Sequence, residues 1–467
     1  MSDALPLPPR PNIEQYKKRA KDLVKICKSG HRDGLRAWAA EWISTLVELY
    51  DLDITLPREG HRAYTPAEIN YRIDHTVDRI AKQMNATARG SGSACTLTRA
   101  QFALAREHGF ASWPKFVKHL DGLMHPNSEV SDFEAAVDAI VSGDLTTLKK
   151  LLKKNPGLTR ERSTREHRST LLHYVSANGV EDFRQKTPQN IVEITRLLLK
   201  AGADVNAESD AYGGRSTTLG LTATSCHPED AGVQLPLMDL LIDKGAIIDG
   251  PDGGSAVNGC LHNGRGEAAE YFASRGARLD LEGAAGVGRL DVVKSFFKDD
   301  GSLKSSVTEQ QKLDGFAWAC EFGRTSVIDF LLQRGIAVDT RLRHDGQIGL
   351  HWAALGGHTD AVRLLLQHGS PVDFKDETHD GTPLDWALYG WGNIAEERAQ
   401  VRDYYEVVAL LIRSGAKPNP SWFKDNDEQG RAAGKIRSDK KMMSALSGTF
   451  QPDKHTKRQS GRNENLD

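Results

Sequence analysis

The residues best suited to metal chemistry in this sequence lie close together in its N-terminal quarter. Asp74, His75 and Asp78 fall within about one helical turn, so a helix would place two carboxylates and an imidazole near one another. Carboxylate and imidazole groups ligate divalent metals. The same spacing is also that of any solvated helix face, and we favour this second interpretation.

Two glycine-rich stretches, residues 212–217 and 283–288, superficially resemble phosphate-binding loops. Neither contains the Gly-Lys-Ser/Thr sequence that makes a Walker motif specific, and neither follows a strand in a strand-helix-strand unit. The sequence also contains neither HExxH nor Gly-x-Ser-x-Gly. We therefore expect no catalytic residue, no metal and no cofactor, and we interpret the glycines as loop glycines.

Three histidines belong to a recurring pattern. His173 and His351 occupy equivalent positions, and His358 lies at a turn. A histidine at such a position can hydrogen-bond the backbone of the neighbouring unit. We interpret His173 and His351 as structural residues.

The elements that position these residues repeat along the second half of the chain. A leucine-rich, helix-like run ends in a glycine six times, and Asp or Asn follows four residues later, mostly at intervals of about 31 to 46 residues. A helix commonly ends on a residue at positive φ, which glycine adopts without a Cβ clash. We expect the Asp or Asn side chain to bond the backbone two residues on. The pairs are Gly202/Asn206, Gly245/Asp249, Gly276/Asp280, Gly335/Asp339, Gly369/Asp373 and Gly415/Asn419.

Each unit consists of a short helix of small residues, a tight turn and a more apolar helix. The stretch beginning at Trp318 aligns without gaps on the stretch beginning at Trp352, an offset of 34 residues. Residues 170–173, 348–353 and 382–387 carry parts of the sequence Thr-Pro-Leu-His-x-Ala, the last with Asp in place of His. These units resemble ankyrin repeats, which are about 33 residues long with a turn and two antiparallel helices. The resemblance implies an all-α ankyrin-repeat solenoid, preceded here by a small helical domain.

Four segments follow from these patterns. Residues 1–10 are predicted to be disordered, 11–125 to form a helical N-terminal domain, 126–420 to form an array of about eight units, and 421–467 to be a disordered basic tail. In residues 431–467, nine Lys or Arg stand against four Asp or Glu, with few large apolar residues to bury. We expect the N-terminal domain to cap the first repeat.

Residues 100–114 resemble the helical segment that precedes the repeats in a group of bacterial ankyrin-repeat proteins. The resemblance implies a bacterial protein.

Charge, hydropathy and cysteines point to a cytoplasmic protein. The 61 basic and 63 acidic residues leave no global field that would attract nucleic acid or a membrane. We find neither a signal peptide nor a transmembrane stretch. The five cysteines form no CxxC pair and favour reduced thiols. They are Cys27, Cys95, Cys226, Cys260 and Cys320.

Insertions between the two helices of a unit are candidates for recognition. They occupy residues 178–190 in the second unit, 225–236 in the third and 390–400 in the last, and repeat insertions often lie on the binding face. The first two should form one patch, with the turn at residues 212–215 at the opposite edge. Neutral variation of loop length is the alternative. The candidate residues in these segments are Phe183, Arg184, Tyr212, Arg215, His227, Asp230 and Trp391.

Trp318, Trp352 and Trp386 occupy the same position in three consecutive units. They could form a stripe that binds a partner, although packing between repeats is the interpretation we favour.

The sequence thus predicts a scaffold or adaptor that binds another protein and has no enzyme activity. The alternative is an enzyme or small-molecule sensor, with its site in the N-terminal domain or between the long loops of the second and third repeats.

Overall fold

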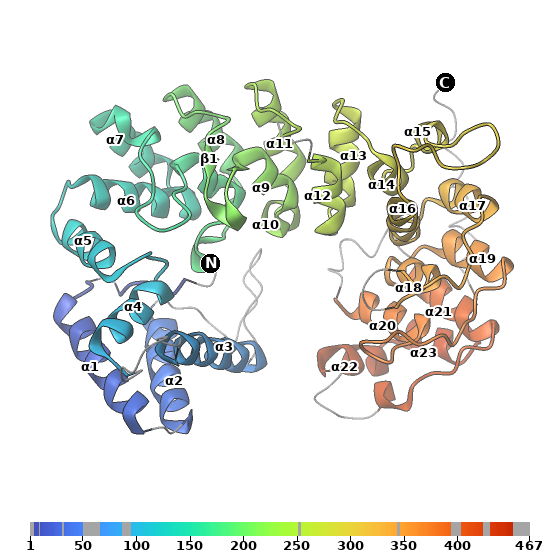
Figure 1. Cartoon of the computed structure of the whole chain (residues 1–467), viewed down its shortest axis with the longest axis horizontal. Helices are drawn as coiled ribbons and strands as arrows, with labels where there is room; N and C mark the ends of the chain where they lie inside the picture. Colours follow the sequence, from blue (N-terminus) through green and yellow to red (C-terminus); the bar gives the residue numbers. More distant parts are fainter. Residues whose placement is uncertain are drawn as a thin grey trace. The chain divides into compact units, whose positions relative to one another are not determined.

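The computed structural model describes residues 4–8, 10–29, 32–49, 66–85, 95–250, 254–342, 346–393, 403–423 and 430–451. The chain forms two compact units, Met1–Gly250 and Pro251–Asp467, and each is described by itself (Figure 1). The described residues are mostly helical, with one two-stranded antiparallel sheet among them. The predicted all-α class is confirmed.

The first unit combines the N-terminal helices α1 to α5 with three repeated helix pairs, α6/α7, η2/α8 and α9/α11. Its elements are α1 (Ile13–Ser29), α2 (Arg32–Leu49), α3 (Pro66–Asn85), α4 (Leu97–Glu107), α5 (Trp113–Met124), α6 (Glu129–Ser142), α7 (Leu145–Lys154), η1 (Pro156–Thr159), η2 (Leu171–Ser176), η3 (Asp182–Arg184), α8 (Ile191–Lys200), β1 (Glu208–Ser209), η4 (Ala211–Gly213), β2 (Ser216–Thr217), α9 (Thr218–Thr224), α10 (Cys226–Asp230) and α11 (Gln234–Asp243).

The helices α1 to α4 enclose an apolar core of their own. Leu23 of α1, Trp42 of α2, Ile80 of α3 and Leu104 of α4 are buried in one cluster. Each helix supplies an apolar stripe at helical spacing, and burial of these stripes is what holds the four together.

The N-terminal segment differs from the predicted disorder at residues 4–8. Leu5 N donates to Glu107 O at 2.7 Å, and Leu7 is buried in a cluster with Phe110 and Phe116. Prolines prevent a helix here, but an extended chain still buries its leucines. Residues 1–3 and 9 lie outside the described part of the chain.

The N-terminal helices pack on the first repeated helix pair. Glu166 N donates to Gly109 O at 2.9 Å, and Arg106 forms an ion pair with Glu166. Helices α5 and α6 approach so closely that a Cβ on Gly122 would lie 2.9 Å from the side chain of Val130. The contact lies where a cap is expected, while the contribution of that cap to solubility stays a prediction.

The glycines that close the repeats have the predicted conformation. All six lie at φ between 83° and 100°. The residue after each glycine donates its N–H to a carbonyl five positions back, as Ala203 N does to Leu198 O at 3.1 Å. Carbonyl groups at the end of each of these helices therefore accept hydrogen bonds from the backbone of the following turn.

Three of the residues that follow these glycines behave differently from the prediction: Asp280 Oδ1 accepts from Gly283 N, three residues on, at 2.8 Å, and two others bond outside their own turn. Asn206 Nδ2 donates to Gly245 O at 2.9 Å, while its Oδ1 accepts from Ile247 N at 2.9 Å. Asp373 Oδ1 accepts from Lys417 N at 3.1 Å. A bond to the backbone two residues on is the wrong expectation for both, because their side chains instead join one turn to the next turn along the array.

In the described residues of the second unit there are five helix pairs and two terminal helices. Its elements are α12 (Ala256–His262), α13 (Gly266–Ser274), α14 (Leu281–Gly286), α15 (Leu290–Ser295), α16 (Glu309–Glu321), α17 (Thr325–Gln333), α18 (Gly349–Leu355), α19 (Thr359–Gln367), α20 (Pro383–Asn393), α21 (Tyr404–Arg413), η5 (Pro420–Phe423), α22 (Gly430–Ser438) and α23 (Lys440–Leu446).

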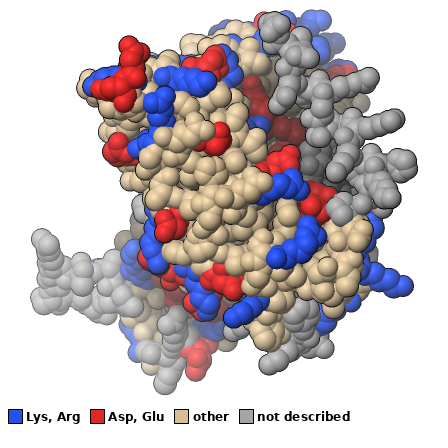
Figure 2. Space-filling view, turned by 90° about the vertical axis from the view of Figure 1, so that its right-hand side faces the viewer, with Lys and Arg blue, Asp and Glu red and all other residues tan. Residues whose placement is uncertain are grey.

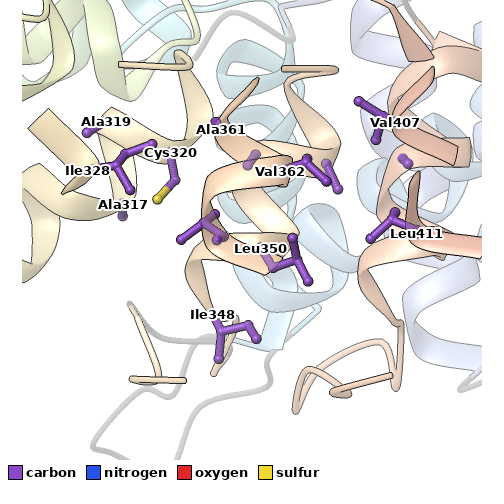
Figure 3. Close-up of a cluster of buried hydrophobic side chains, with 14 of the residues drawn as sticks. Ala317, Ala319, Cys320, Ile328, Ile348, Leu350, Ala361, Val362, Val407 and Leu411 are labelled. Atoms are coloured by element: carbon purple, nitrogen blue, oxygen red, sulfur yellow. The ribbon is translucent and has the colours of Figure 1, made fainter. Parts of the chain in front are cut away.

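A continuous apolar cluster runs through the second unit from α14 to α23. Figure 3 shows part of it, with Ala317 and Cys320 of α16 beside Ile328 of α17, and Leu350 of α18 beside Val362 of α19. Small residues on the first helix of each pair let successive pairs approach closely. A Cβ on Gly356 would lie only 2.3 Å from Glu321 O, so this contact requires glycine.

The predicted tail is partly folded. Helices α22 and α23 pack against α20 and α21, with Ile436, Met442 and Leu446 buried in the apolar cluster. Tyr405 donates its hydroxyl to Asp439 at 2.9 Å. Disorder is therefore the wrong expectation for residues 430–451, because the few apolar residues there lie on one side and cover the last repeat. Residues 424–429 and 452–467 lie outside the described part of the chain.

The expectation of five reduced cysteines is wrong for two of them. Cys27, in α1, and Cys95, just before α4, form a disulfide with Cα atoms 5.7 Å apart. Their separation of 68 residues hid the pairing, because only packing of α1 on α4 brings them together.

Among the described residues, no helix is long and apolar enough to cross a membrane.

The disulfide should contribute measurably to stability. It closes a loop of 68 residues, so the variant Cys27→Ser/Cys95→Ser should lose about 2 to 4 kcal/mol of unfolding free energy. Thermal unfolding with and without dithiothreitol measures the effect. The variant Cys226→Ser, which changes a half-buried cysteine outside the disulfide, serves as control. Equal melting temperatures with and without reductant would show that the crosslink is absent or without effect.

Candidate protein-interaction surface

The hairpin formed by β1 and β2 carries an exposed aromatic side chain on a constrained turn. Tyr212 is 71% exposed, the largest exposed fraction among the large apolar and aromatic residues that the structure describes. It has φ 51°, and Gly213, Gly214 and Arg215 after it also have positive φ. Non-glycine residues occupy this region at a cost, and such conformations persist where the surroundings enforce them.

The inserted loop of the second unit holds this tyrosine in place. The Tyr212 hydroxyl donates to Asn178 Oδ1 at 2.6 Å, and Asn178 Nδ2 donates to Leu221 O and to Thr224 Oγ1, each at 3.1 Å. The predicted position of residues 212–215 at the opposite edge from the loop is wrong. The first residue of the insertion, Asn178, is a contact that the sequence pattern did not single out.

The two neighbouring insertions touch. Gln189 Nε2 of the first donates to Ala231 O of the second at 3.4 Å. Asp230, at the end of α10, is exposed, while His227 on the same helix is half-buried. The predicted neighbourhood of the two loops therefore holds. We call Asn178, Tyr212, Arg215 and Asp230 the hairpin-loop residues.

Ion pairs balance the charges around the hairpin. Arg215 Nε lies 3.6 Å from Glu208 Oε1, and Arg168 Nε lies 3.8 Å from Asp210 Oδ2. All four side chains are about half exposed or more. Exposed pairs of this kind contribute little to folding, so they can exchange partners when another protein binds.

Arg184, expected on the binding face, is instead buried. Its Nη1 lies 2.6 Å from Glu134 Oε2 and its Nη2 lies 2.8 Å from Asp138 Oδ1. Its guanidinium also lies over the ring of Phe183, with 5.4 Å between Cζ and the ring centroid. The insertion thus anchors itself to α6 through Arg184, and this arginine is not available to a partner.

A second arginine completes a buried cluster of four charges. Arg165 Nη1 lies 2.7 Å from Glu134 Oε1 and 2.9 Å from Glu181 Oε1, and Tyr174 donates its hydroxyl to Glu181 at 3.3 Å. Burial alone would raise the pKa of Glu134, but the charges of Arg165 and Arg184 outweigh it and lower this pKa to about 2. The pKa of Glu181 is also held well below its usual value, against the effect of burial, first of all by Arg165. We call Glu134, Arg165, Glu181 and Arg184 the buried charge cluster.

The tryptophan positions differ in exposure and do not form an open stripe. Trp318 is 2% exposed and donates its indole N–H to Glu282 at 2.6 Å. Trp352 and Trp386 are half-buried, with ring centroids 5.4 Å apart, and Trp386 donates to Asp376 at 2.9 Å. These contacts agree with the packing interpretation.

Trp391, the candidate in the last insertion, is also unavailable. It is 5% exposed, and Lys435 of α22 lies over its ring at 4.7 Å. The remainder of that insertion, residues 394–400, lies outside the described residues.

The face of the molecule drawn in Figure 2 shows Lys and Arg interspersed with Asp and Glu, so neither charge dominates it.

The repeat histidines have the predicted structural role. His173 Nδ1 accepts from Thr170 N at 3.1 Å, and its Nε2 donates to Ser216 O of the next unit at 3.2 Å. His351 repeats the arrangement, accepting from Ile348 N at 3.2 Å and donating to Gly381 O at 3.1 Å. Each imidazole therefore joins two consecutive units.

Asp385, which replaces the histidine in the last of these motifs, keeps only half of this pattern. Its Oδ2 accepts from Thr382 N at 2.9 Å, as the histidine Nδ1 does in the other units. Its Oδ1 accepts from the indole N–H of Trp422, in η5, at 2.7 Å.

The other positions considered for chemistry lie on the N-terminal helix α3. Asp74, His75 and Asp78 are exposed on α3, and Asp74 pairs with Arg36 at 2.7 Å. Within the described residues, no group of three or more His, Cys, Asp or Glu could hold a metal ion. A shallow depression lies between α8 and α11 rather than between the inserted loops, and Arg196 and Asp239 contribute to its lining.

Comparison with known proteins finds ankyrin repeats in one segment of the chain. Residues 316–421 match a family model described as ankyrin repeats (3 copies). The human ASB11 ankyrin repeat domain is 19% identical over 61% of this chain and 99% of its own, with a TM-score of 0.30. The ankyrin repeat domain of Bcl-3, described as a unique member of the IkappaB protein family, is 21% identical over 54% of this chain and 93% of its own, with a TM-score of 0.27. No curated protein matches the chain.

The matched segment and the helix pairs together identify an ankyrin-repeat fold, as the sequence predicted.

From the buried charge cluster we predict that Arg184→Ala lowers the unfolding free energy of the protein and does not only weaken partner binding. Removing one partner leaves Glu134 buried with less counter-charge, at a cost of roughly 3 to 5 kcal/mol. Urea unfolding measures the loss, with Arg196→Ala, an exposed arginine of α8, as control. If Arg184→Ala were as stable as Arg196→Ala, the cluster would not have the structural role that its geometry indicates.

The buried histidines predict a loss of stability in mild acid. Burial lowers the pKa of His108 to about 3 and the pKa values of His119 and His173 to about 4, below the ordinary 6.5. Between these values the unfolded chain binds more protons than the native protein, so the unfolding free energy falls as the pH drops from about 6.5 to about 4. Urea unfolding across this range measures the slope.

His119→Gln should reduce that slope, whereas His125→Gln, at an exposed position of the chain, should leave it unchanged. A urea midpoint that stays constant over the same pH range would contradict the account.

Proposed function

We propose that this protein is a binding module for another protein and that the hairpin-loop residues form the centre of the contact. One observation carries the proposal: Tyr212 is highly exposed, lies at positive φ and is fixed by Asn178. Tyrosine and arginine are enriched among the residues that dominate binding energy at protein interfaces. A side chain already held in place also loses less conformational freedom when it binds.

The neighbouring residues support the choice of a protein as the ligand. Arg215, three residues after the tyrosine, and Asp230, on the insertion of the third unit, are exposed, and the ion pairs of the hairpin are solvent-exposed. An aromatic centre with polar residues at its rim is the usual composition of a protein interface. The alternative of an enzyme or small-molecule sensor is not adopted, because Arg184, the candidate arginine of the first inserted loop, is used inside the buried charge cluster.

Two further expectations stay predictions. The bacterial origin depends on the resemblance of residues 100–114 alone. The cytoplasmic location depends in part on reduced cysteines, and the Cys27–Cys95 disulfide is instead typical of an oxidising compartment, since disulfides persist there.

Tyr212→Ala should weaken partner binding while the protein stays folded. Loss of a central aromatic anchor costs about 2 kcal/mol or more, which corresponds to roughly 30-fold in Kd. The exposed hydroxyl bond to Asn178 is lost from the fold, and a hydrogen bond of this kind contributes about 1 kcal/mol to the unfolding free energy.

The experiment uses wild-type, Tyr212→Ala and Tyr389→Ala proteins as bait, because Tyr389 is a second exposed tyrosine at 59% exposure. Bound proteins are identified by mass spectrometry, and affinities are then measured with the purified partner. A partner that Tyr212→Ala binds as tightly as wild type does would refute the assignment of this surface.

A further inference from the structure

Helix α1 presents a row of lysines on its solvent-facing side. All five of its lysines are exposed. At 3.6 residues per turn they fall within an arc of about 100°, and they extend over about 16 Å of the helix. The lysines are Lys17, Lys18, Lys21, Lys25 and Lys28, and we call them the lysine face.

The orientation of this face is fixed by the opposite side of the helix. Tyr16, Ala20 and Leu23 are buried in the apolar clusters of the N-terminal domain. The helix therefore cannot rotate to bury the lysines or to expose its apolar residues. Its single arginine, Arg19, lies over the ring of Trp42 at 5.7 Å and belongs to the packed side.

The acidic residues of α1 neutralise only part of the charge. Lys17 pairs with Glu14 at 2.7 Å and Lys25 with Asp22 at 3.3 Å. Such exposed pairs contribute little and are readily exchanged. In the described part of the chain, no carboxylate lies within salt-bridge distance of Lys18, Lys21 or Lys28. In contrast to the mixed charges of the face in Figure 2, this row has a positive excess.

The composition of the row indicates what kind of partner it fits. Lysine is a flexible point charge and offers no planar fork for bidentate recognition. Among the described residues of α1, no large apolar side chain is exposed. The row therefore lacks both the aromatic anchor of a typical folded interface and an apolar group that would insert into a lipid surface. An extended anion with regularly spaced charges is the complementary ligand.

We propose that the lysine face binds an extended, acid-rich polypeptide segment. Lysines four residues apart on the helix are separated by about 6 Å along its axis. Alternate side chains of an extended chain lie about 6.6 Å apart on one side, so a segment with Asp or Glu at every second position matches the row. The site is independent of the hairpin-loop residues, and its failure would leave the proposed function untouched.

The test measures binding of a fluorescein-labelled oligoglutamate peptide to the full-length protein by fluorescence anisotropy. Binding should weaken steeply as salt is added, because the interaction is between exposed charges. The variant Lys18→Gln/Lys21→Gln/Lys28→Gln should bind about tenfold more weakly at low salt, as expected from removing three exposed charge contacts.

A matched control separates the row from lysine content in general. Lys149→Gln/Lys150→Gln/Lys153→Gln removes three exposed lysines from α7, another basic helix of the same unit. This control should keep the wild-type Kd within about twofold, since its lysines are not on α1. Both variants should melt within a few degrees of wild type, because exposed substitutions change stability by about 0.5 kcal/mol or less. The single variant Lys21→Gln gives the same comparison if the triple variant is less stable.

Three outcomes would overturn the proposal. The first is that oligoglutamate does not bind the wild-type protein. The second is equal weakening in the α1 and α7 variants, which would show unspecific attraction. The third is that phosphatidylserine vesicles or duplex DNA bind more tightly than oligoglutamate and are lost in the α1 variant, which would identify a different class of anion.

Discussion

The first unit depends on a simple electrostatic requirement, because two buried carboxylates must be compensated by buried positive charges. Glu134 lies on α6 and Glu181 at the start of the insertion, and neither could remain ionised in an apolar interior without Arg165 and Arg184. These four residues come from three separate segments of the chain. Their pairing therefore determines where the inserted loop lies, and with it the position of Asn178.

The position of Asn178 in turn explains why Tyr212 is held so firmly on the surface. The loop that begins at Asn178 is anchored from inside by Arg184, and Asn178 itself binds α9 before it accepts the tyrosine hydroxyl. An internal charge cluster thus fixes an external aromatic residue through a few covalent and hydrogen bonds. The residue proposed to bind, Tyr212, lies on the hairpin, whereas the residues that support it, Asn178 and Arg184, belong to the insertion, and the sequence alone does not show this division of roles.

This division marks how far the sequence could predict the structure. Glycines at the end of each repeat were predictable because a local backbone conformation requires them, and all six have it. His173 and His351 were predictable because they recur at equivalent positions. The pairing of Arg184 with Glu134 was not, because the two are 50 residues apart and ion pairs have no period. The disulfide between Cys27 and Cys95 and the packing of α22 and α23 on the last repeat were not predictable either, because both join segments that are distant in the sequence and follow no repeat.

The repeated histidine position also accounts for the end of the array in physical terms. An imidazole accepts at Nδ1 and donates at Nε2, so His173 and His351 can each bond their own turn and a carbonyl of the following hairpin. A carboxylate only accepts, so Asp385 keeps the bond to its own turn but cannot bond a further carbonyl. The group it does bind is a donor, the indole of Trp422. A further repeat would place a carbonyl next to this position, and a histidine could donate to it. The segment that follows Asp385 is instead η5, which places the indole N–H of Trp422 there, and a carboxylate can accept from it. The change from His to Asp thus fits the last unit of the array.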